Sequence, residues 1–380
     1  MNTLRVPSLR DALAEVTEFR QAQGRRYELL SVLLLCCVAV MCGYSSQAAI
    51  AEWGANYGRK WLQRLGINRR RGPSQPTLHR IFKGIDCEQL ERVMARWAEL
   101  VLESHALLSG SLEAVALDGK TLCGSQRQGA KDAHLLSALS HRLGVVMAQI
   151  AVEDRTNEIG QVDELLAALV LEGRIITADS LLTQREIAKS IVDSGGDYLL
   201  PVKENQPALR EDIALVFNEA KLLQDTITEA RTVDQHGGRI EERRLRASTA
   251  LSGYTDWPGH QQVLEVERTI TDKASGEARR EVAYAITSLK ASRATAGQLL
   301  QIWREHWHIE NKLHWVRDVT FDEDRSQVRT ARIPQVMAVL RNVAISLLRV
   351  CGAENIAAAT RRYAARPALA LAAVGLNLRE

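Results

Sequence analysis

Several features that would assign a protein class at once are scarce or missing in this 380-residue sequence. No low-complexity tract and no internal repeat occurs, so the composition is that of an ordinary globular protein. The six cysteines show no paired metal-ligand spacing and predict reduced core residues of a cytoplasmic protein. The net charge is only +3, so no overall excess of basic residues indicates a nucleic-acid partner.

One apolar run resembles a membrane anchor but is too short to span a bilayer. The longest apolar segment, residues 29–43 (LLSVLLLCCVAVMCG), has about 15 residues, whereas a helix that crosses a bilayer needs roughly 20. It also begins too far from Met1 for an ordinary signal peptide. We therefore expect a fully buried helix and no membrane partner.

The chain length suits two or three domains, and the first is predicted to be helical. Apolar residues recur at helical spacing up to about residue 105, which predicts an all-helical N-terminal domain over residues 1–108. Within it, residues 59–71 (RKWLQRLGINRRR) carry six Arg or Lys and no acid. This positive patch, which includes Arg69, Arg70 and Arg71, is either a solvated loop or a surface for nucleic acid.

Two short predicted helices flank that patch. One begins near Ser45, which serves as its cap, and the other covers residues 76–82 (PTLHRIF). Such a pair is typical either of a helix-turn-helix DNA reader or of an ordinary helical bundle. In the first case, the second helix presents Gln75, Thr77, His79 and Arg80 to a DNA groove.

The hydrophobic period changes at residue 111, where a mixed α/β region begins. The pattern predicts strands at 112–118, 134–140, 143–152, 174–179 and 197–202, and helices at 158–171 and 183–194. The second and third strands should form a hairpin, and the last strands should be parallel because helices link them. Residues 208–292 predict a β-rich insertion, with strands near 226–234, 239–247, 261–270 and 279–288.

Acidic residues stand at the ends of two of these strands. Asp118 closes the first strand and Asp179 closes the fourth. In an open α/β sheet, ligands and catalytic groups gather at the carboxyl ends of strands. Each acid also has an ordinary explanation, because Asp118-Gly119 suits a turn and Asp179 can cap the next helix.

A third acid, Glu310, lies in residues 304–315 (REHWHIENKLHW). On a regular α-helix, with about 100° per residue, Glu310 is at the centre of one arc of side chains. The arc comprises Trp303, His306, Glu310, His314 and Arg317. A zinc site is disfavoured, because the two histidines of the arc are about 12 Å apart along such a helix. Three carboxylates suit magnesium instead, which prefers oxygen ligands.

Several motifs, taken in order, resemble the DDE transposases of bacterial insertion sequences, in the branch that includes the H-repeat-associated proteins. They are 24–54 (GRRYELLSVLLLCCVAVMCGYSSQAAIAEWG), 117–125 (LDGKTLCGS), 157–159 (NEI), 177–180 (TADS), 196–206 (GDYLLPVKENQ), 239–241 (RIE), 306–311 (HWHIEN) and 314–315 (HW). The resemblance covers nearly the whole chain.

This resemblance implies a ribonuclease-H-like catalytic domain over residues 109–350, which contains the β-rich insertion, and a helical tail over residues 351–380. It implies that Asp118, Asp179 and Glu310 are the catalytic residues and bind two Mg²⁺ or Mn²⁺ ions. It also implies DNA contacts by a second set of residues, namely Lys203, Asn205, Gln206, His306 and Arg317. In the N-terminal domain, the expected DNA contacts are Arg69, Arg70, Arg71 and Arg80.

The sequence departs from the family pattern at several of these positions. The usual tyrosine, arginine and lysine around the glutamate are replaced by Trp303, His306 and Arg317. Glu204 stands where the family usually has glycine, and Ser180 where it usually has alanine. None of these changes removes a predicted metal ligand. Trp303 and Trp307 are expected to pack their helix onto the sheet or onto DNA.

The expected function is transposition. The protein would bind double-stranded DNA at the terminal inverted repeats of its element, act as an endonuclease at the element ends, and transfer the 3′-OH strand to target DNA. The expected setting is the bacterial cytoplasm, in association with the nucleoid, and the expected assembly is a homodimer on DNA. Two alternatives stay open, a catalytically silent DNA-binding relic and a nuclease that cuts without joining.

Overall fold

A computed structural model describes residues 8–106, 112–122, 134–152 and 158–376. Cys123 and Asn157, which belong to two of the motifs above, lie outside these residues. Packing divides the chain into two compact units. The first unit comprises Met1–Ser111, Asp118–Leu169 and His308–Glu380, and the second comprises Leu112–Leu117 and Val170–Trp307. The domain boundaries expected from the sequence remain predictions.

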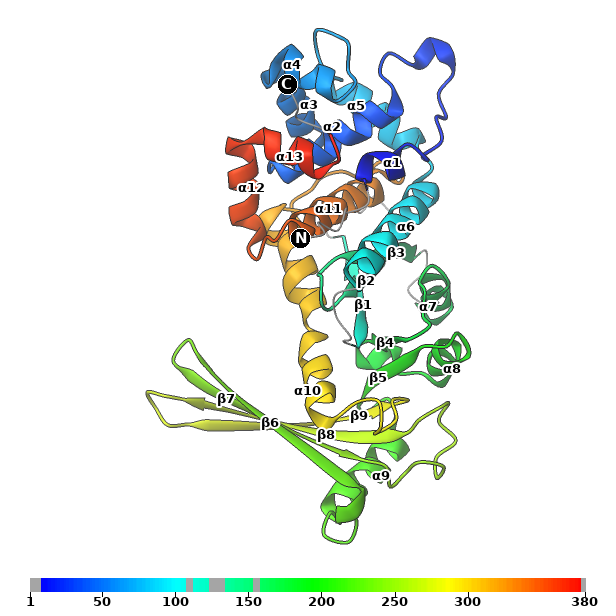
Figure 1. Cartoon of the computed structure of the whole chain (residues 1–380), viewed down its shortest axis with the longest axis vertical. Coiled ribbons are helices and arrows are strands. Elements are labelled where there is room, and N and C mark those ends of the chain that lie inside the picture. The colour runs from blue at the N-terminus through cyan, green and yellow to red at the C-terminus, as the bar shows by residue number, and fades with distance from the viewer. Residues whose placement is uncertain (1–7, 107–111, 123–133, 153–157, 377–380) are drawn as a thin grey trace. The chain divides into compact units, whose positions relative to one another are not determined.

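Helices dominate the first unit, and they confirm that the N-terminal region is helical (Figure 1). They are α1 (Leu9–Leu13), α2 (Leu29–Met41), α3 (Gln47–Asn56), α4 (Gly58–Arg64), α5 (Gln75–Gly84), α6 (Cys87–Ala106), α7 (Glu158–Ala167), α11 (Ile333–Val350), α12 (Ile356–Ala365) and α13 (Pro367–Ala373), with a 3₁₀ turn at Ala22–Gly24.

Helix α2 is the predicted buried helix, and the structure confirms it. Its residues from Val32 to Met41 are at most 2% exposed, and it contacts α1, α3, α11, α12 and α13. Because neighbours cover it on several sides, it can be apolar around its whole circumference. Helix α11 is also long and apolar enough to cross a membrane, and 83% of that stretch is buried inside the protein.

Of the five cysteines that the structure describes, four follow the prediction. Cys36, Cys37, Cys42 and Cys87 are buried thiols outside any disulfide, as expected of small core residues. Cys351 is exposed, because it follows the last residue of α11 where that helix ends at the surface. The prediction of a core position was wrong for this cysteine.

Strands β2 (His134–Ser140) and β3 (Val146–Val152) form the predicted antiparallel hairpin in the first unit. Strand β2 neighbours β1 (Glu113–Thr121), whose last residues belong to this unit and whose first residues belong to the second. Helices α6, α7 and α11 contact β3. The hairpin is therefore covered by helices, and its residues are largely buried.

In the second unit the strands run in the order β1-β4-β5-β9-β8-β7-β6. Strands β4 (Arg174–Thr177) and β5 (Asp197–Val202) are parallel to each other and to β1, as predicted from the helices that connect them. The insertion supplies the antiparallel strands β6 (Ile227–His236), β7 (Arg239–Ser248), β8 (Gln262–Asp272) and β9 (Ala278–Thr287), and β9 pairs with β5. All four strands predicted for the insertion are present.

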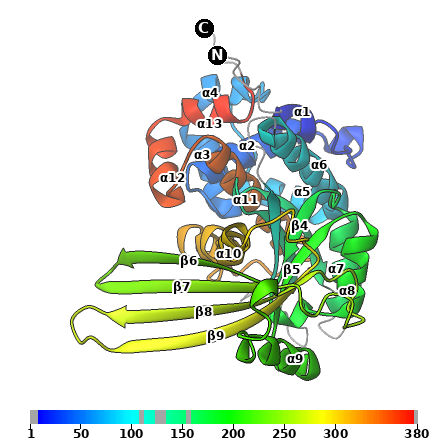
Figure 2. The same cartoon turned by 60° about the horizontal axis from the view of Figure 1, so that its bottom comes forward.

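The remaining elements of the second unit are helical. They are α8 (Arg185–Asp193), α9 (Pro207–Asn218) and α10 (Ala296–Glu305), with 3₁₀ turns at Ser180–Leu182 and Gln224–Thr226. Helix α10 lies against β6 and β7 (Figure 2). Its Leu299 and Leu300 belong to one apolar core with Leu245, Leu264 and Ala285 of the sheet. That core fixes α10 on the insertion.

A buried polar cluster joins α6, β3 and α11 of the first unit. The Glu91 carboxylate accepts hydrogen bonds from Nε2 of Gln149 and from Nε2 of Gln335, both at 3.0 Å. Asn342 donates a further bond to Oε1 of Gln149 at 2.7 Å. Burial raises the pKa of the Glu91 carboxyl to about 7, and the two amide donors offset only part of that effect.

We predict that Glu91→Gln removes a pH-dependent loss of stability. As the pH rises from 4.5, the usual pKa of a glutamate, the unfolded state ionises before the folded state does. The free energy of unfolding should therefore fall up to pH 7 by an amount on the order of 3 kcal/mol. Urea unfolding at acidic and at slightly basic pH should show this fall in the unchanged chain and a smaller fall in Glu91→Gln.

The matched control is Glu103→Gln, which removes an exposed carboxylate from the same helix. It should keep the pH dependence of the unchanged chain. An equally steep loss of stability in Glu91→Gln would contradict the buried-carboxyl explanation.

Candidate active site

The segment that carries Glu310 is not a regular α-helix. Helix α10 ends at Glu305, residues 306–307 form a turn, and two π-helical segments follow, η5 (Glu310–His314) and η6 (Val316–Thr320). The wider turn of a π-helix changes which side chains share a face, and such segments occur often at functional sites. The prediction of one α-helical arc from residue 303 to residue 317 was therefore wrong.

The residues of that arc have different environments. His306 belongs to the second unit, where its Nδ1 lies 3.0 Å from Oγ1 of Thr177. Arg317 belongs to the first unit and is 0% exposed, and its Nε donates to Oε2 of Glu323 at 2.7 Å. A buried guanidinium that is paired with a carboxylate does not fit the predicted contact of Arg317 with a DNA phosphate.

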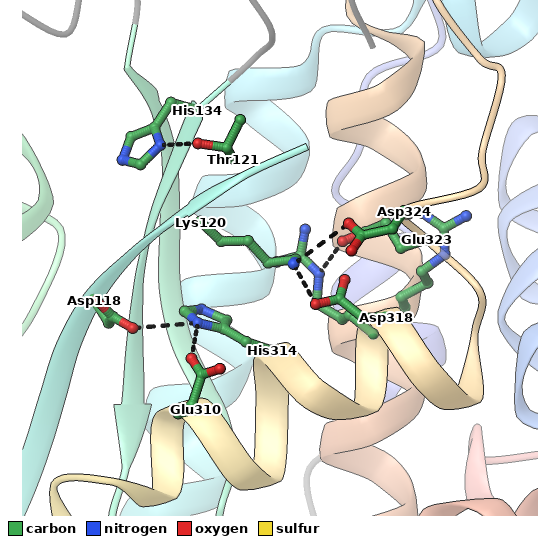
Figure 3. A network of polar contacts seen from close by, with 11 residues as sticks. Asp118, Lys120, Thr121, His134, Glu310, His314, Asp318, Glu323 and Asp324 are labelled. Carbon is green, nitrogen blue, oxygen red and sulfur yellow. Dashed lines mark hydrogen bonds and ion pairs between the residues drawn. The ribbon is translucent and has the colours of Figure 1, made fainter. Parts of the chain in front are cut away.

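Two of the three predicted catalytic acids come together in the first unit, around a histidine (Figure 3). Nδ1 of His314 lies 3.2 Å from Oδ2 of Asp118 and 3.2 Å from Oε2 of Glu310. One ligand atom from each of the three residues lies within 4.8 Å of the other two. Strand β1 presents Asp118, and η5 presents both Glu310 and His314.

Asp118 is not part of a turn, so the ordinary explanation of Asp118-Gly119 is excluded. Strand β1 continues to Thr121, and the Gly119 amide donates to Oδ1 of Asp118 at 2.9 Å. A Cβ atom at position 119 would lie 2.5 Å from Nε2 of His134 on β2. Glycine therefore leaves room for the His134 side chain beside Asp118.

The charges within this cluster stabilise one another. The hydrogen bond from His314 lowers the pKa of Glu310 against the opposing effects of burial and of the nearby Asp118 carboxylate. Burial by itself would lower the pKa of His314, but its bonds to Asp118 and Glu310 outweigh burial and raise that pKa. The imidazole therefore favours the ionised form of Glu310.

The donor atoms fit a divalent cation. The side chains of Asp118 and Glu310 are 26% and 56% exposed, so both carboxylates reach solvent, whereas the His314 ring is 4% exposed and held in place. Carboxylate oxygens and imidazole nitrogens are common ligands of Mn²⁺ and related ions, and carboxylates also suit Mg²⁺. A cation entering from solvent would reach the carboxylates first.

Lys120 adds a positive charge next to the acids (Figure 3). It follows Asp118 by two residues on β1, so the two side chains share one face of the strand. Its Nζ lies 2.6 Å from Oδ2 of Asp318 and 3.8 Å from Oδ1 of Asp324. These two carboxylates hold the ammonium group in position, and its charge helps to keep the pKa of Glu310 low.

A buried ion cluster anchors the π-helical segment. The Glu323 carboxylate accepts hydrogen bonds from Nε of Arg317 and from Nη1 of Arg341, both at 2.7 Å. Arg341 lies on α11, and its Nη2 also donates to the Ser45 carbonyl at 3.1 Å. Burial opposes the charge of Glu323, but the two guanidinium groups lower its pKa. This cluster ties η6 to α11 and to the loop before α3.

The third predicted acid, Asp179, belongs to the second unit. Its Oδ1 accepts bonds from the amides of Leu181 and Leu182 at 3.0 and 3.2 Å, so the helix-capping explanation is correct for a 3₁₀ turn. Strands β1 and β4 pair in parallel with Ala116 opposite Thr177. Asp118 comes two residues after Ala116, and Asp179 comes two residues after Thr177.

Asp179 also lines a cavity of about 340 Å³ in the second unit. Polar and aromatic side chains share its wall with the acid, among them Lys203, Arg268, Tyr284, Trp303, His306 and Trp307. Trp303 packs against the apolar core, as expected, whereas Trp307 is 58% exposed. The acid, two cations and an exposed aromatic ring are thus close together in one hollow.

The loop after β5 supports the loop that carries Asp179. Nδ2 of Asn205 donates to the Ser180 carbonyl at 2.7 Å, and Nε2 of Gln206 donates to the Thr183 carbonyl at 3.1 Å. Both residues were predicted to contact DNA, and the structure gives their amide groups a positioning role as well. Lys203 of the same loop is exposed.

The predicted DNA contacts of the N-terminal region are exposed. Arg69, Arg70, Arg71 and Arg80 all lie on the surface. Arg69 donates from Nε to the Arg26 carbonyl at 2.8 Å, and Arg80 donates from Nε to the Pro76 carbonyl at 3.3 Å. Helices α3 and α5 are in contact, and the cap of α3 is Ser46 rather than the predicted Ser45.

Comparison with known proteins identifies the family. Residues 110–347 match the family model described as "Transposase DDE domain", and residues 10–98 match the model described as "DDE_Tnp_1-associated". The chain belongs to the DDE transposase family. The family that the sequence motifs indicated is therefore confirmed.

Similar proteins include two curated relatives from Escherichia coli. "Putative transposase YncI" of strain O157:H7 is 30% identical over 355 residues, which cover 91% of this chain and 88% of that protein. "H repeat-associated putative transposase YhhI" of strain K12 is 29% identical over 356 residues, which cover 91% of each.

One solved structure aligns with nearly all of the chain. The cryo-EM structure of the piggyBac transposase synaptic complex with hairpin DNA covers 98% of this chain and 79% of its own, at 10% identity and a TM-score of 0.40. A score this low does not establish a shared fold.

His314 and Lys120 are the candidate site residues to which the sequence assigned no role. The spacing of both residues could have indicated a role, because His314 follows Glu310 by four residues and Lys120 follows Asp118 by two. Either spacing places two side chains on one face of a helix or strand. What the sequence could not give is the packing of η5 against β1, which brings the two pairs together.

We predict that Glu323→Gln strongly destabilises the chain. The substitution leaves the buried guanidinium groups of Arg317 and Arg341 without their counter-charge, which should cost about 3–5 kcal/mol. Urea unfolding followed by circular dichroism measures this cost. The control is Asp322→Asn at the neighbouring exposed position, which should cost much less. Equal stabilities of the two variants would show that the buried cluster does not anchor the segment.

Proposed function

We propose that this chain is an insertion-sequence transposase that binds the terminal inverted repeats of its element, cleaves DNA at the element ends and joins the freed 3′-OH strands to target DNA. The observation that carries this proposal is the cluster of Asp118 and Glu310 around His314. Membership of the DDE transposase family supports the reaction class.

The third catalytic carboxylate in this proposal is Asp179. The parallel register that pairs Ala116 with Thr177 supports this assignment, because Asp118 and Asp179 each come two residues after this pair. Equivalent residues of parallel strands emerge at the same edge of a sheet. The parallel strands β1, β4 and β5, with the β2–β3 hairpin, also support a ribonuclease-H-like fold for the catalytic region.

The carboxylates of Asp118, Asp179 and Glu310 would hold two Mg²⁺ or Mn²⁺ ions. Such ions, when bound, activate a water molecule or a 3′-OH and stabilise the leaving oxygen of a phosphodiester. Carboxylates close together repel one another. His314 contacts Asp118 and Glu310 and holds them in place before DNA arrives, and the charge of Lys120 also reduces the repulsion.

DNA binding would use several exposed cations. Near Asp179, Lys203 is exposed and available to phosphates, and His306 lines the same cavity, while Asn205 and Gln206 hold the Asp179 loop in position. In the N-terminal region, the exposed arginines before and within α5 would contact the inverted repeats. We place the reaction in the bacterial cytoplasm, on the nucleoid, with a homodimer pairing two element ends.

We predict that Asp118→Asn, Asp179→Asn and Glu310→Gln each abolish cleavage while DNA binding is retained. Removing a residue that only supports a metal ligand costs about 10- to 100-fold, so removing a ligand should cost more than about 100-fold. The assay mixes purified protein, Mg²⁺ and duplex DNA taken from the regions that flank the coding frame. Cleaved and joined products are then separated on a gel.

The control for these variants is Asp193→Asn, an exposed aspartate on α8 that pairs with Lys189. It should cut like the unchanged chain. Cleavage that survives all three substitutions would disprove the proposed site. Binding without cleavage by the unchanged chain would indicate a silent relic, and cleavage without joining would indicate a nuclease.

A second prediction concerns the positive patch of the N-terminal region. Replacing Arg69, Arg70 and Arg71 together by glutamine should weaken DNA binding and lower the slope of log K against log salt by about 2–3, roughly one unit for each phosphate that is no longer neutralised. Fluorescence anisotropy at several salt concentrations measures that slope. A variant with glutamine at the exposed Arg361 and Arg362 of α12 should keep the original slope. An unchanged slope in the triple variant would exclude the patch from the DNA interface.

A further inference from the structure

His314 has an unusual position for a buried histidine. Its ring is 4% exposed, yet Nδ1 lies 3.2 Å from a carboxylate oxygen of Asp118 and 3.2 Å from one of Glu310 (Figure 3). Its Nε2 is buried without a hydrogen-bond partner among the described residues. The polar contacts that orient this ring are therefore those with the two carboxylates.

The spacing of the three donor atoms suits a single cation. Nδ1 of His314 lies 3.2 Å from an oxygen of each acid, and one ligand atom from each of the three residues lies within 4.8 Å of the other two. Metal-ligand distances to oxygen and to imidazole nitrogen are about 2.0–2.2 Å in sites of Mg²⁺ and the transition metals. Small shifts of the side chains would complete the contact.

The backbone also favours a fixed arrangement. Glu310 and His314 stand at the two ends of the same π-helical segment, and the buried pair of Arg317 with Glu323 anchors the chain immediately after it. Asp118 lies within β1, two residues after Ala116, which pairs with Thr177 of β4. Groups held on regular elements keep their geometry better than groups on loops.

We infer that His314 is a nitrogen ligand of the cation held by Asp118 and Glu310, and that it makes this site prefer Mn²⁺ to Mg²⁺. This inference rests on the proposed function, and it revises the oxygen-only ligand set expected from the sequence. Imidazole is a common ligand of transition metals, whereas Mg²⁺ binds through carboxylates, phosphates and water. His314 thus determines which ion the site selects.

Electron spin-echo envelope modulation of bound Mn²⁺ tests this inference directly, because it detects nitrogen nuclei coupled to the metal. Full-length protein with one equivalent of Mn²⁺ should show a ¹⁴N coupling, which changes to a ¹⁵N coupling when the protein is made with ¹⁵N-histidine. This comparison uses the unchanged chain, so no folding defect of a variant can affect the result.

Variants then assign the coupling to one residue. His314→Gln should lose the nitrogen coupling and weaken Mn²⁺ binding by more than about tenfold, while Mg²⁺ binding weakens less than about threefold. His308→Gln is the matched control from the same segment and should keep both the coupling and the affinity. His314→Asp supplies an oxygen ligand, so its bound Mn²⁺ should show no nitrogen coupling, while its affinity for Mg²⁺ should be kept.

The outcomes separate this inference from the proposed function. Mn²⁺ that binds in dependence on Asp118 and Glu310, but shows no histidine coupling, would overturn the role of His314 and leave the cation site intact. Histidine-coupled Mn²⁺ in a chain that never cuts DNA would support the ligand and contradict the proposed reaction. Absence of Mn²⁺ binding in a chain that cuts DNA with Mg²⁺ would overturn the inference and leave the proposed function intact.

Discussion

The buried carboxylate of Glu323 is the interaction on which the first unit's site depends. It neutralises Arg317 from the π-helical segment and Arg341 from α11, and Arg341 in turn bonds to the Ser45 carbonyl. An unpaired charge in this interior would be costly, so the three groups hold their segments together. Because Arg317 follows His314 by three residues, this cluster also fixes the direction in which Glu310 and His314 face β1.

In the neighbouring site of Asp118, Glu310 and His314, other side chains offset the negative charges of the two acids. Two carboxylates that lie close together repel each other. A histidine and a lysine near the two acids reduce this repulsion. His314 contacts both acids, and Lys120 is held beside them by Asp318 and Asp324. Such an arrangement suits a divalent ion, as the reaction that we propose requires.

The second unit contributes a differently built region. Its Asp179 is fixed by two backbone amides, and the side chains of Asn205 and Gln206 brace the same loop. The insertion extends the sheet beyond β5, and α10 packs on it through an apolar core. The cavity that Asp179 shares with Lys203, His306 and Trp307 offers a charged and aromatic surface of the kind that suits a nucleic-acid strand.

The sequence by itself determined the helical N-terminal region, the buried helix α2, the hairpin, the parallel strands and the four strands of the insertion. Each of these depends on local periodicity and turn residues, which a single chain displays directly. The motifs around Asp118, Asp179 and Glu310 likewise identified the family. Tertiary structure alone decided which side chains meet, because contacts between distant segments leave no periodic trace. Tertiary packing buries Arg317 and places His314 between two acids that are far apart in the sequence. The chain also forms a π-helix at Glu310 in place of the expected α-helix.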